Sequence, residues 1–484
     1  MALSCMQSAW HARVAGSVRP VLMLGLVFGS IGLHAQTDPG VRVDAVPAVG
    51  GMLPGLNATQ QANFADGLAN FITVRSLKGS TSPATQEGLG PRFNSNSCGS
   101  CHSQPAIGGT SPSSNPQFVL AALMNNAQPF FVTANGPVRE ARFKRVVQGG
   151  GFFRGGGEGG APDGGVHDLY TITGVANTIT AAGPDRTTPQ TCTLTQPDFA
   201  QAQSTNNLSL RIPTPVFGGG LVESISDATI LASHAASAAD RQAFRIRGRP
   251  NRNGNDGTIT KFGWKAQNAT LLLFSGEAYS VEMGVSNEIF SVERANPGET
   301  LPAGCLFNPI PEDATGAGDN TGLSDIQQFA TFMELLAPPA PVASFTNAAG
   351  TMVSPASIAN GLAVFTNRAR CALCHTPSLT ASPSNFVAGT TQVNLFSDLM
   401  VHNMGETLAD GISQGLAGPN EFRTAPLWGL GQRIFFLHDG RTSDLVQAIH
   451  LHGGSESEAR VSVEQFNGLS ATDKQDLLNF LRSL

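Results

Sequence analysis

The sequence predicts a mainly α-helical protein of two small domains, the first of which carries a large, irregular and partly β insertion. Three observations lead to this prediction. The motif C-x-x-C-H occurs twice, as Cys-Gly-Ser-Cys-His at 98–102 and as Cys-Ala-Leu-Cys-His at 371–375. Apolar residues at helical spacing flank both motifs. Between the motifs, residues 117–310 alternate short apolar runs with glycine-dense loops and keep no helical period.

Both motifs have the spacing that attaches a haem group covalently. Two thiols on neighbouring faces of one helical turn can form thioethers with the haem vinyl groups, and the adjacent His can bind the iron. A structural zinc site or a redox dithiol would leave that His unexplained. The predicted ligands of two haem c groups are Cys98, Cys101 and His102 for the first and Cys371, Cys374 and His375 for the second.

Residues 1–35 are expected to be a cleaved export signal. Arg13 and Arg19 precede an apolar run at 21–33, and Ala35 offers a small residue at the cleavage position. This run is too short to span a bilayer comfortably. No other apolar stretch in the sequence approaches the length of a transmembrane helix. We therefore expect a periplasmic or secreted protein with no transmembrane segment after cleavage.

The composition excludes some partners and suggests a disulfide. The formal charge is −6, only 13% of residues are charged, and we find no Lys/Arg cluster typical of nucleic-acid binding. Cys5 would leave with the signal, so Cys192 and Cys305 remain after the haem ligands are assigned. In an exported protein such a pair is most simply a disulfide, and the alternative is two buried thiols.

Taken in order, residues 36–56 predict an extended leader and residues 57–337 a first cytochrome c-like domain with the insertion at 117–310. Its opening helix follows Asn57, with Phe64, Leu68 and Phe71 on one face. Its closing helix starts at Ser324, where Gln327 completes a capping box.

Residues 338–354 are predicted to be a linker, and 355–484 a second cytochrome c domain. Ser354 followed by Pro355 begins a helix that runs into the second motif. A terminal helix follows Ser470, which is positioned to cap against Asp473. A helix before the haem motif and another at the end would enclose the haem edge.

Seven segments, in this order, resemble those of the di-haem oxidoreductase family (loosely called thiol oxidoreductases), which is similar to di-haem cytochrome c peroxidases and MauG-type enzymes. The resemblance covers most of residues 57–484. The segments are Gly-Leu-Gly-Pro-Arg-Phe-Asn at 88–94, Arg-Ile-Pro-Thr-Pro at 211–215, Phe-Gly-Trp-Lys-Ala at 262–266, His-Asn-Met-Gly at 402–405, Phe-Arg-Thr-Ala-Pro-Leu-Trp-Gly at 422–429, Leu-His-Asp-Gly-Arg at 437–441 and Ala-Ile-His-Leu-His-Gly-Gly at 448–454.

The resemblance implies a haem-dependent, peroxidase-like oxidoreductase, with a reactive N-terminal haem and a C-terminal haem that relays electrons. The implied partner is a small redox protein or a small-molecule electron donor or acceptor. The resemblance specifies neither the substrate nor whether a calcium ion binds between the domains. A non-catalytic di-haem electron carrier, or a redox-linked binding protein, is the alternative hypothesis. The long insertion favours the enzyme, because a carrier needs no such roof over a haem.

A peroxide site needs an acid–base group on the open side of the haem. The insertion offers Glu277, Glu282 and His167, although each taken singly is more simply a surface or structural residue. Trp264 and Trp428 could each bridge the haems, with packing as the simpler role.

The sixth ligand of the C-terminal haem is predicted to be His452, with Met404 as the alternative. His452 occupies the position at which the resemblance places the distal Met of the electron-relay haem, and Gly453 and Gly454 follow it. Histidine in place of Met would lower the reduction potential of this haem. The other competitors are His402, His438 and His450.

Overall fold

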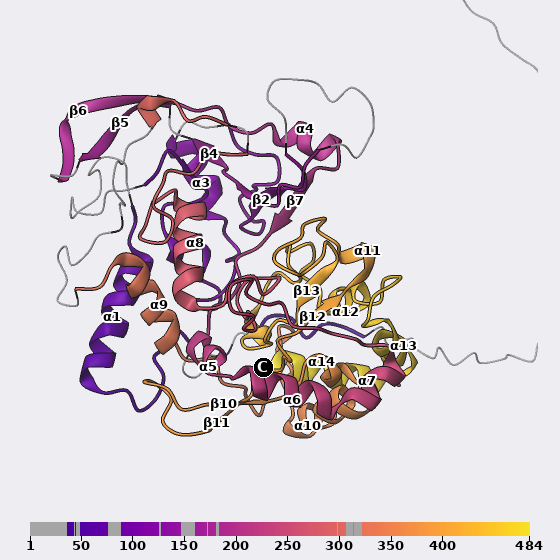
Figure 1. Cartoon of the computed structure of the whole chain (residues 1–484). Coiled ribbons are helices and arrows are strands. Elements are labelled where there is room, and N and C mark those ends of the chain that lie inside the picture. The colour runs from indigo at the N-terminus through magenta and orange to yellow at the C-terminus, as the bar shows by residue number, and fades with distance from the viewer. Residues whose placement is uncertain are drawn as a thin grey trace, which may run out of the picture. The chain divides into compact units, whose positions relative to one another are not determined.

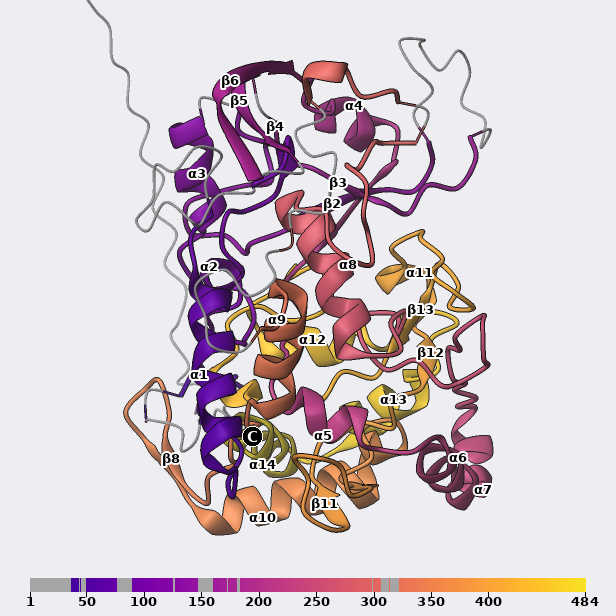
Figure 2. The same ribbon diagram turned by 60° about the vertical axis from the view of Figure 1, so that its left-hand side comes forward.

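The computed structural model describes residues 36–42, 44, 49–75, 89–124, 127–146, 160–171, 173–180, 183–297, 299–305, 313 and 322–484. The predicted export signal and most of the glycine run at 148–160 lie outside these residues. The chain from Gln36 to Leu484 forms one compact unit. Figure 1 shows the arrangement of its elements, and Figure 2 turns the same view by 60°. The described residues of 36–56 contain no helix or strand longer than a single bridge.

The first motif is enclosed by two helices that lie side by side in both views, α1 (Ala58–Ile72) and α9 (Asp325–Leu335). Both begin with a capping box, as the sequence predicts for α9. Gly67 of α1 lies where a Cβ would come within 2.6 Å of the Gln328 carbonyl oxygen. The missing side chain therefore lets the two backbones approach closely.

The second motif has a matching helix pair, α10 (Pro355–Ala363) and α14 (Ala471–Ser483). Ser354 and Ser470 cap these helices as predicted. Gly361 of α10 again faces a partner backbone, because an added Cβ would clash with the Asp476 carbonyl oxygen. A π-helical turn, η2 (Val364–Arg368), continues α10 toward the motif.

The insertion contains more helix than the sequence predicts. Two of its short apolar runs are helical, because residues 118–124 belong to α3 (Pro116–Met124) and residues 271–274 open α8 (Leu271–Met283). Helix α8 is apolar on several sides, so no single stripe marks it, although Thr270 caps its start and Gly284 ends it. The remaining helices are α2 (Cys98–Cys101), α3 (Pro116–Met124), α4 (Phe199–Ser204), α5 (Gly219–Glu223), α6 (Asp227–Ala236), α7 (Ala238–Phe244), α8 (Leu271–Met283), α11 (Gly405–Leu408), α12 (Leu445–Leu451), α13 (Arg460–Gly468), η1 (Ala303–Cys305), η3 (Cys371–Leu373) and η4 (Leu430–Gln432).

The strands form small antiparallel sheets. The three-stranded sheet has the order β3-β2-β7, from β3 (Val166–His167), β2 (Glu140–Phe143) and β7 (Leu208–Arg211). The two-stranded pairs are β1 (Arg92–Phe93) with β4 (Tyr170–Thr171), β5 (Thr173–Thr180) with β6 (Gly183–Thr193), β8 (Phe345–Thr346) with β9 (Met352–Val353), β10 (Leu379–Ala381) with β11 (Thr391–Val393), and β12 (Val401–Asn403) with β13 (Glu421–Arg423). The pair β8–β9 shows that residues 338–354 are more structured than a plain linker.

A disulfide joins Cys192 at the end of β6 to Cys305, with a Cα–Cα distance of 4.6 Å. The larger apolar core runs from Leu53 to Trp428 and so takes in residues of both predicted domains. A second core lies between α10, α12 and α14. In the part of the chain that the structure describes, no helix is both long and apolar enough to cross a membrane.

Candidate functional site

The first motif opens into a cavity of about 140 Å³. Cys98 and Cys101 lie on the short helix α2, and their side chains line this cavity together with His102. Residues of α8 and β2 form other parts of the wall. A cofactor attached through both cysteines would therefore face residues of the insertion.

The geometry of His102 suits a metal ligand. Its Nδ1 lies 3.1 Å from the Gly109 carbonyl oxygen, so the N–H is donated there and Nε2 keeps its lone pair. Burial lowers its pKa to about 4, which keeps the ring neutral. Neutral imidazole with one nitrogen fixed by a backbone carbonyl is the usual state of an iron-binding His.

The second motif lines a separate cavity of about 230 Å³. Cys371 lies on η3, and Cys374 and His375 follow it directly. His375 Nδ1 lies 3.0 Å from the Phe396 carbonyl oxygen, and burial lowers the pKa of His375 to about 4. Each motif thus presents two thiols and one neutral, oriented imidazole to a cavity, which is the arrangement that a covalently attached haem requires.

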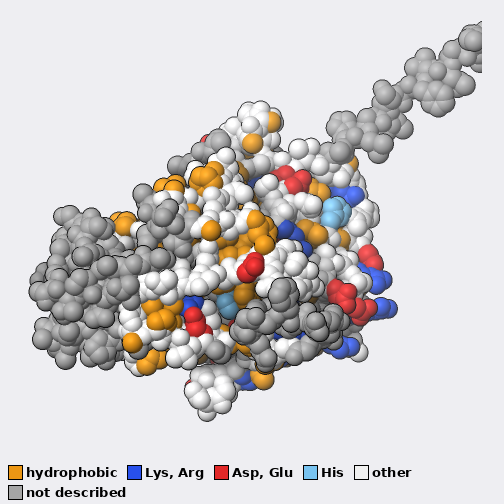
Figure 3. Space-filling model, turned by 90° about the horizontal axis from the view of Figure 1, so that it is seen from above, with side chains coloured by type: hydrophobic (Ala, Val, Ile, Leu, Met, Phe, Trp, Pro, Cys, Tyr) orange, Lys and Arg blue, Asp and Glu red, His pale blue; other side chains and the backbone are white. Residues whose placement is uncertain are grey.

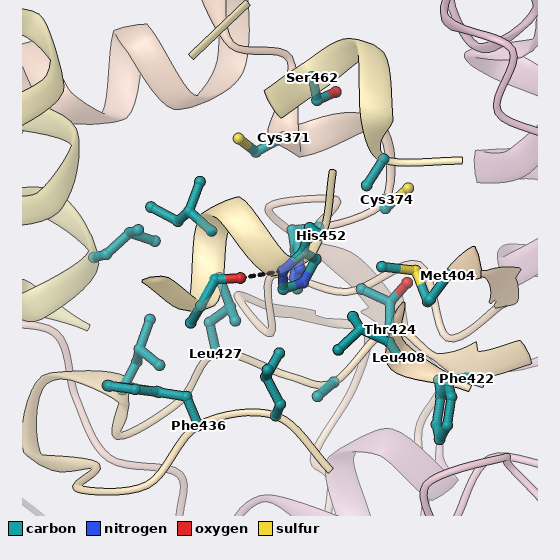
Figure 4. A pocket seen from close by; sticks show the side chains of 18 of the residues that line it. Cys371, Cys374, Met404, Leu408, Phe422, Thr424, Leu427, Phe436, His452 and Ser462 are labelled. Atoms are coloured by element: carbon teal, nitrogen blue, oxygen red, sulfur yellow. Dashed lines mark hydrogen bonds between the residues drawn. The ribbon is translucent and has the colours of Figure 1, made fainter. Parts of the chain in front are cut away.

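His452 projects into the C-terminal cavity, with Cys371 and Cys374 on one side (Figure 4). Its Nδ1 lies 2.7 Å from the Ala448 carbonyl oxygen one helical turn earlier, which leaves Nε2 as a free acceptor. Burial lowers the pKa of His452 as well. Met404 lines the same cavity, so the predicted ligand and its sulfur alternative are both placed beside the second motif.

The remaining histidine competitors have other contacts. His402 is held between carboxylates, with Nδ1 2.8 Å from Glu458 and Nε2 3.0 Å from Asp398. Although burial alone would lower its pKa, the neighbouring Cys374 and Asp398 raise it well above the usual value. Both ring nitrogens are hydrogen-bonded to carboxylates, so neither is free for iron. His438 lines the cavity but stacks on a ring, and His450 does not line it.

Two carboxyl groups meet in the N-terminal cavity. Glu282 of α8 and Glu140 of β2 are hydrogen-bonded to each other, and both line the cavity wall. Burial, together with the Glu140 charge, raises the pKa of Glu282 well above its usual value. Burial alone would also raise the pKa of Glu140, but Arg142 at 2.5 Å outweighs it and holds that pKa low. These opposite shifts favour a proton of the pair on Glu282 rather than on Glu140.

The other two acid–base candidates differ in their placement. Glu277 lines the N-terminal cavity and accepts a hydrogen bond from Asn268. His167 instead lines a third cavity, where its Nε2 lies 2.7 Å from Asp163 and its ring stacks on Phe143 at 3.8 Å. The structure thus brings two of the three candidates to the motif and places His167 elsewhere.

Glu140 was not predicted to belong to the site. Its partner Glu282 is far away in sequence, and they meet because β2 and α8 both border the first motif. The sequence around Glu140 alternates charged and apolar residues, as an ordinary half-buried strand does. The only local signal that the Glu140 carboxylate could be paired is the presence of the basic residues Arg139 and Arg142 beside it.

Arginines in the C-terminal cavity supply a further test of whether haem fits. Arg423 and Arg433 line this cavity, and burial lowers the pKa of each to about 10. Neither forms an ion pair with a carboxylate of the described residues. Buried guanidinium groups are normally paired. The two propionates of a haem would supply the missing negative charges.

Trp264 lies between the two cavities and lines both of them. Its indole N–H donates to the Ile212 carbonyl oxygen at 2.9 Å, and its ring meets His438 edge-on at 6.4 Å. Trp428 lines neither cavity and donates to Asn394. Of the two tryptophans singled out in the sequence, only Trp264 is placed to connect the motifs.

A buried charge cluster lies next to Trp264. Asp410 binds Arg211 at 2.5 Å and Lys265 at 3.0 Å, and all three side chains are almost completely buried. Burial lowers the pKa of Lys265 to about 8. Arg211 lines the N-terminal cavity, and Lys265 lies 4.0 Å from the centre of the Phe422 ring, which lines the other cavity. The cluster fixes the wall between the cavities.

Two cavities, each closed by a Cys-Cys-His motif and both lined by Trp264, define a protein built around a pair of Cys-Cys-His sites. The family model described as "Di-haem oxidoreductase, putative peroxidase" matches residues 186–484, more than half of the chain. The chain belongs to this family of haem oxidoreductases. The matched segment includes the second motif and Glu282 but begins after the first motif and Glu140.

Two further comparisons add no functional argument. None of the curated proteins matches the chain. Among solved structures, a hydrazine synthase of Kuenenia stuttgartiensis, pressurised with xenon, matches 57% of this chain and 73% of its own at 14% identity and a TM-score of 0.28. That score is too low to support even a shared fold. Within the described residues, no group of three or more His, Cys, Asp or Glu side chains is arranged to hold a metal ion such as calcium.

Proposed function

We propose that this protein is an exported, peroxidase-like di-haem oxidoreductase in which the N-terminal haem is reactive and the C-terminal haem relays electrons. The observation that carries this proposal is the difference between the cavities. Among the described residues, His102 is the only His lining the N-terminal cavity, which also holds the Glu140–Glu282 pair. The C-terminal cavity holds His452 in addition to His375.

Cys98, Cys101 and His102 would hold the first haem, and Cys371, Cys374 and His375 the second. Both groups supply one-electron redox chemistry at iron, and an iron with one axial position free can also bind an oxidant. Arg423 and Arg433 would hold the propionates of the second haem. His452 would fill its sixth position, which leaves that haem to electron transfer.

The carboxyl pair would handle protons in the N-terminal cavity. Reducing a peroxide to two waters consumes two protons and two electrons, so a proton must reach the leaving oxygen. Protonated Glu282 holds such a proton, and ionised Glu140 can accept the one that the incoming peroxide releases. Asn94 donates to Glu282 Oε2 at 3.2 Å and keeps the carboxyl group oriented.

Trp264 would connect the two haems, since it lines both cavities. Its N–H is held by a backbone carbonyl, so the ring is fixed in the wall. Electrons would enter at the C-terminal haem from a small redox protein or small molecule. Residues 1–35 have the pattern of an export signal, which fits a compartment where cysteines are oxidised and haem c is attached.

The test is the reaction of the purified ferric protein with hydrogen peroxide, followed in the optical spectrum and by peroxide consumption with an electron donor. We expect two haem masses above the polypeptide, a spectral change at one haem only, and catalytic peroxide consumption. A protein with two haems that neither changes spectrum nor consumes peroxide would be the electron carrier instead, and the enzyme proposal would be wrong.

A further inference from the structure

An arginine-rich surface segment lies against His402, one of the residues that line the C-terminal cavity. Residues 241–252, hereafter the arginine segment, contain five arginines and no acidic residue. The concentration is unusual in a chain of net charge −6 with 13% charged residues. The face in Figure 3, seen from the β5–β6 end of Figure 1, has few charged side chains except toward one edge.

The arginine segment is fixed one imidazole ring away from the second motif. Gly248 lies so close to His402 that an added Cβ would be 2.5 Å from its ring. His402 Nδ1 in turn lies 3.8 Å from Cys374 Sγ. Backbone hydrogen bonds of 3.0 and 2.9 Å between Arg249 and Val401 hold the segment in place. A molecule that contacts this surface would therefore sit near the thioether edge of the second haem.

Nearby carboxylates are already engaged. Glu458 accepts hydrogen bonds from the backbone N–H groups of Arg247 and Gly248, both at 3.0 Å, and also binds His402. Glu421 pairs with Arg249, and Asp240 pairs with Arg370 outside the segment. These contacts leave little negative charge at the surface to neutralise the rest of the segment.

Four of the five arginines have no carboxylate partner among the described residues, and one of these four, Arg241, is buried and donates to the His234 carbonyl oxygen. Arg245 and Arg247 are exposed, and neither pairs with a carboxylate of the described residues. Arg252 donates to the Gly257 carbonyl oxygen rather than to an acid. Arg245 also holds the backbone at a φ of 60°, where it ends α7, so its position is well defined. The result is a fixed positive patch at the C-terminal site.

We propose that the arginine segment is the docking surface for an acidic electron-carrier protein that donates electrons to the C-terminal haem. The inference rests on the proposed relay role of that haem. One electron leaves the reduced cofactor of the partner, the haem iron passes from ferric to ferrous, and no atom is transferred. Opposite charges accelerate and orient such an encounter. A few unpaired charges suit the small, short-lived interfaces of redox partners.

The test measures the binding of a small acidic carrier, a plant-type [2Fe–2S] ferredoxin, to the full-length holoprotein by calorimetry at low and at physiological ionic strength. The variant is Arg245→Glu/Arg247→Glu. Arg145→Glu reverses one charge outside the segment, at a half-buried arginine two residues after β2 without a carboxylate partner, and is compared with each single variant, Arg245→Glu and Arg247→Glu, as well as with the double variant. A basic cytochrome c and a short single-stranded oligonucleotide serve as the alternative ligands.

We expect the acidic carrier to bind with a Kd that rises with salt, and the double variant to raise this Kd at least about tenfold. Arg145→Glu should change it less than about twofold. Equal effects of both variants, no effect of the double variant, or equally tight binding of the basic cytochrome or the oligonucleotide would overturn the inference.

A second readout separates this inference from the proposed function. Haem content and reduction of the C-terminal haem by a small uncharged reductant should be unchanged in Arg245→Glu/Arg247→Glu. If the haem is not reducible in any variant while the binding pattern holds, the relay assignment fails and the docking surface stands. If reduction by the uncharged reductant is normal and the binding pattern is absent, the docking surface fails alone.

Discussion

The two halves of this protein build the same frame around different cavities. Each C-x-x-C-H motif is enclosed by a pair of helices that cross at a glycine, Gly67 in α1 and Gly361 in α10. The N-terminal cavity then receives a pair of carboxyl groups from the insertion, whereas the C-terminal cavity receives His452 from its own domain. Under the proposed function, the frame would position a haem and the added groups would determine what that haem can do.

This comparison suggests how one haem becomes reactive. Under the proposed function, the neutral imidazole of His452 would suit the second haem to electron transfer, whereas the carboxyl groups of the first cavity would supply protons to a reactive haem. The insertion contributes Glu140 and Glu282 to the first site, and it has no counterpart between the second motif and α14. The proposed difference in chemistry therefore has its structural basis in the insertion.

The largest expected effect is the loss of peroxide reactivity when the carboxyl pair is broken. Glu282→Gln keeps the shape of the side chain but cannot transfer its proton, and we expect a rate loss of about a hundredfold or more in stopped-flow reduction of peroxide. Glu140→Gln should act similarly. His167→Gln, in a different cavity, is the control and should stay within about twofold. An equal loss in the control would remove the carboxyl pair from the mechanism.

The next effect concerns the C-terminal haem. His452→Ala should convert this haem from low-spin to high-spin while its covalent attachment is retained, because the imidazole leaves the sixth position. Electron paramagnetic resonance of the ferric protein measures the change. Met404→Leu should leave the spectrum unaltered. If the Met404 variant becomes high-spin and the His452 variant does not, sulfur is the ligand.

Substitution of the two crossing glycines tests whether the frames are equivalent. Gly361→Ala would push a Cβ into the Asp476 carbonyl oxygen, and Gly67→Ala would do the same at Gln328. We expect each to reduce the free energy of unfolding by about 1–3 kcal/mol, as overpacking does. Gly468→Ala, at the end of α13 with open space around it, should be close to neutral. Chemical denaturation of the three variants measures these differences. If all three variants were as stable as the unaltered protein, the paired helices could move apart to accept the added Cβ.

The smallest effect is a difference in pH dependence between the two helix pairs. Burial raises the pKa of Glu334 in α9 to about 7, so the stability it contributes is complete below its unfolded pKa and is lost as pH rises through 7. A hydrogen bond from Arg368 lowers the pKa of Asp473 in α14 to about 2, so its contribution is lost as pH falls through 2. Thermal unfolding should show that Glu334→Gln reduces the change of Tm with pH near neutral pH. Asp473→Asn should reduce the change of Tm with pH at acidic pH. If either variant leaves the pH dependence of Tm unaltered in its range, the shifted pKa assigned to that residue is wrong.

The sequence predicts the frame well because local signals determine it. Ser324, Ser354 and Ser470 cap helices where capping residues and apolar stripes coincide, and the structure confirms all three. Helix α8 was missed because it is buried on more than one side and has no amphipathic period. The two haem motifs are local too, so their positions were predictable.

The remainder of the candidate site depends on contacts between distant segments. Glu140 meets Glu282 only because β2 and α8 border the same cavity. The sequence around either residue does not indicate this contact. His167 was a reasonable candidate by residue type, but β3 directs it into another cavity. The docking role of residues 241–252 also depends on tertiary structure, because Gly248 must reach His402 for the segment to border the second motif.

The most direct test of the central claim is the spin state of each haem in the ferric protein. Electron paramagnetic resonance of the intact protein should show one high-spin and one low-spin haem. In Cys98→Ala/Cys101→Ala, which should lose the first haem, the high-spin signal should disappear and the low-spin signal remain. In Cys371→Ala/Cys374→Ala the opposite should hold. Loss of the low-spin signal from the first variant would reverse the roles of the two cavities and contradict the account.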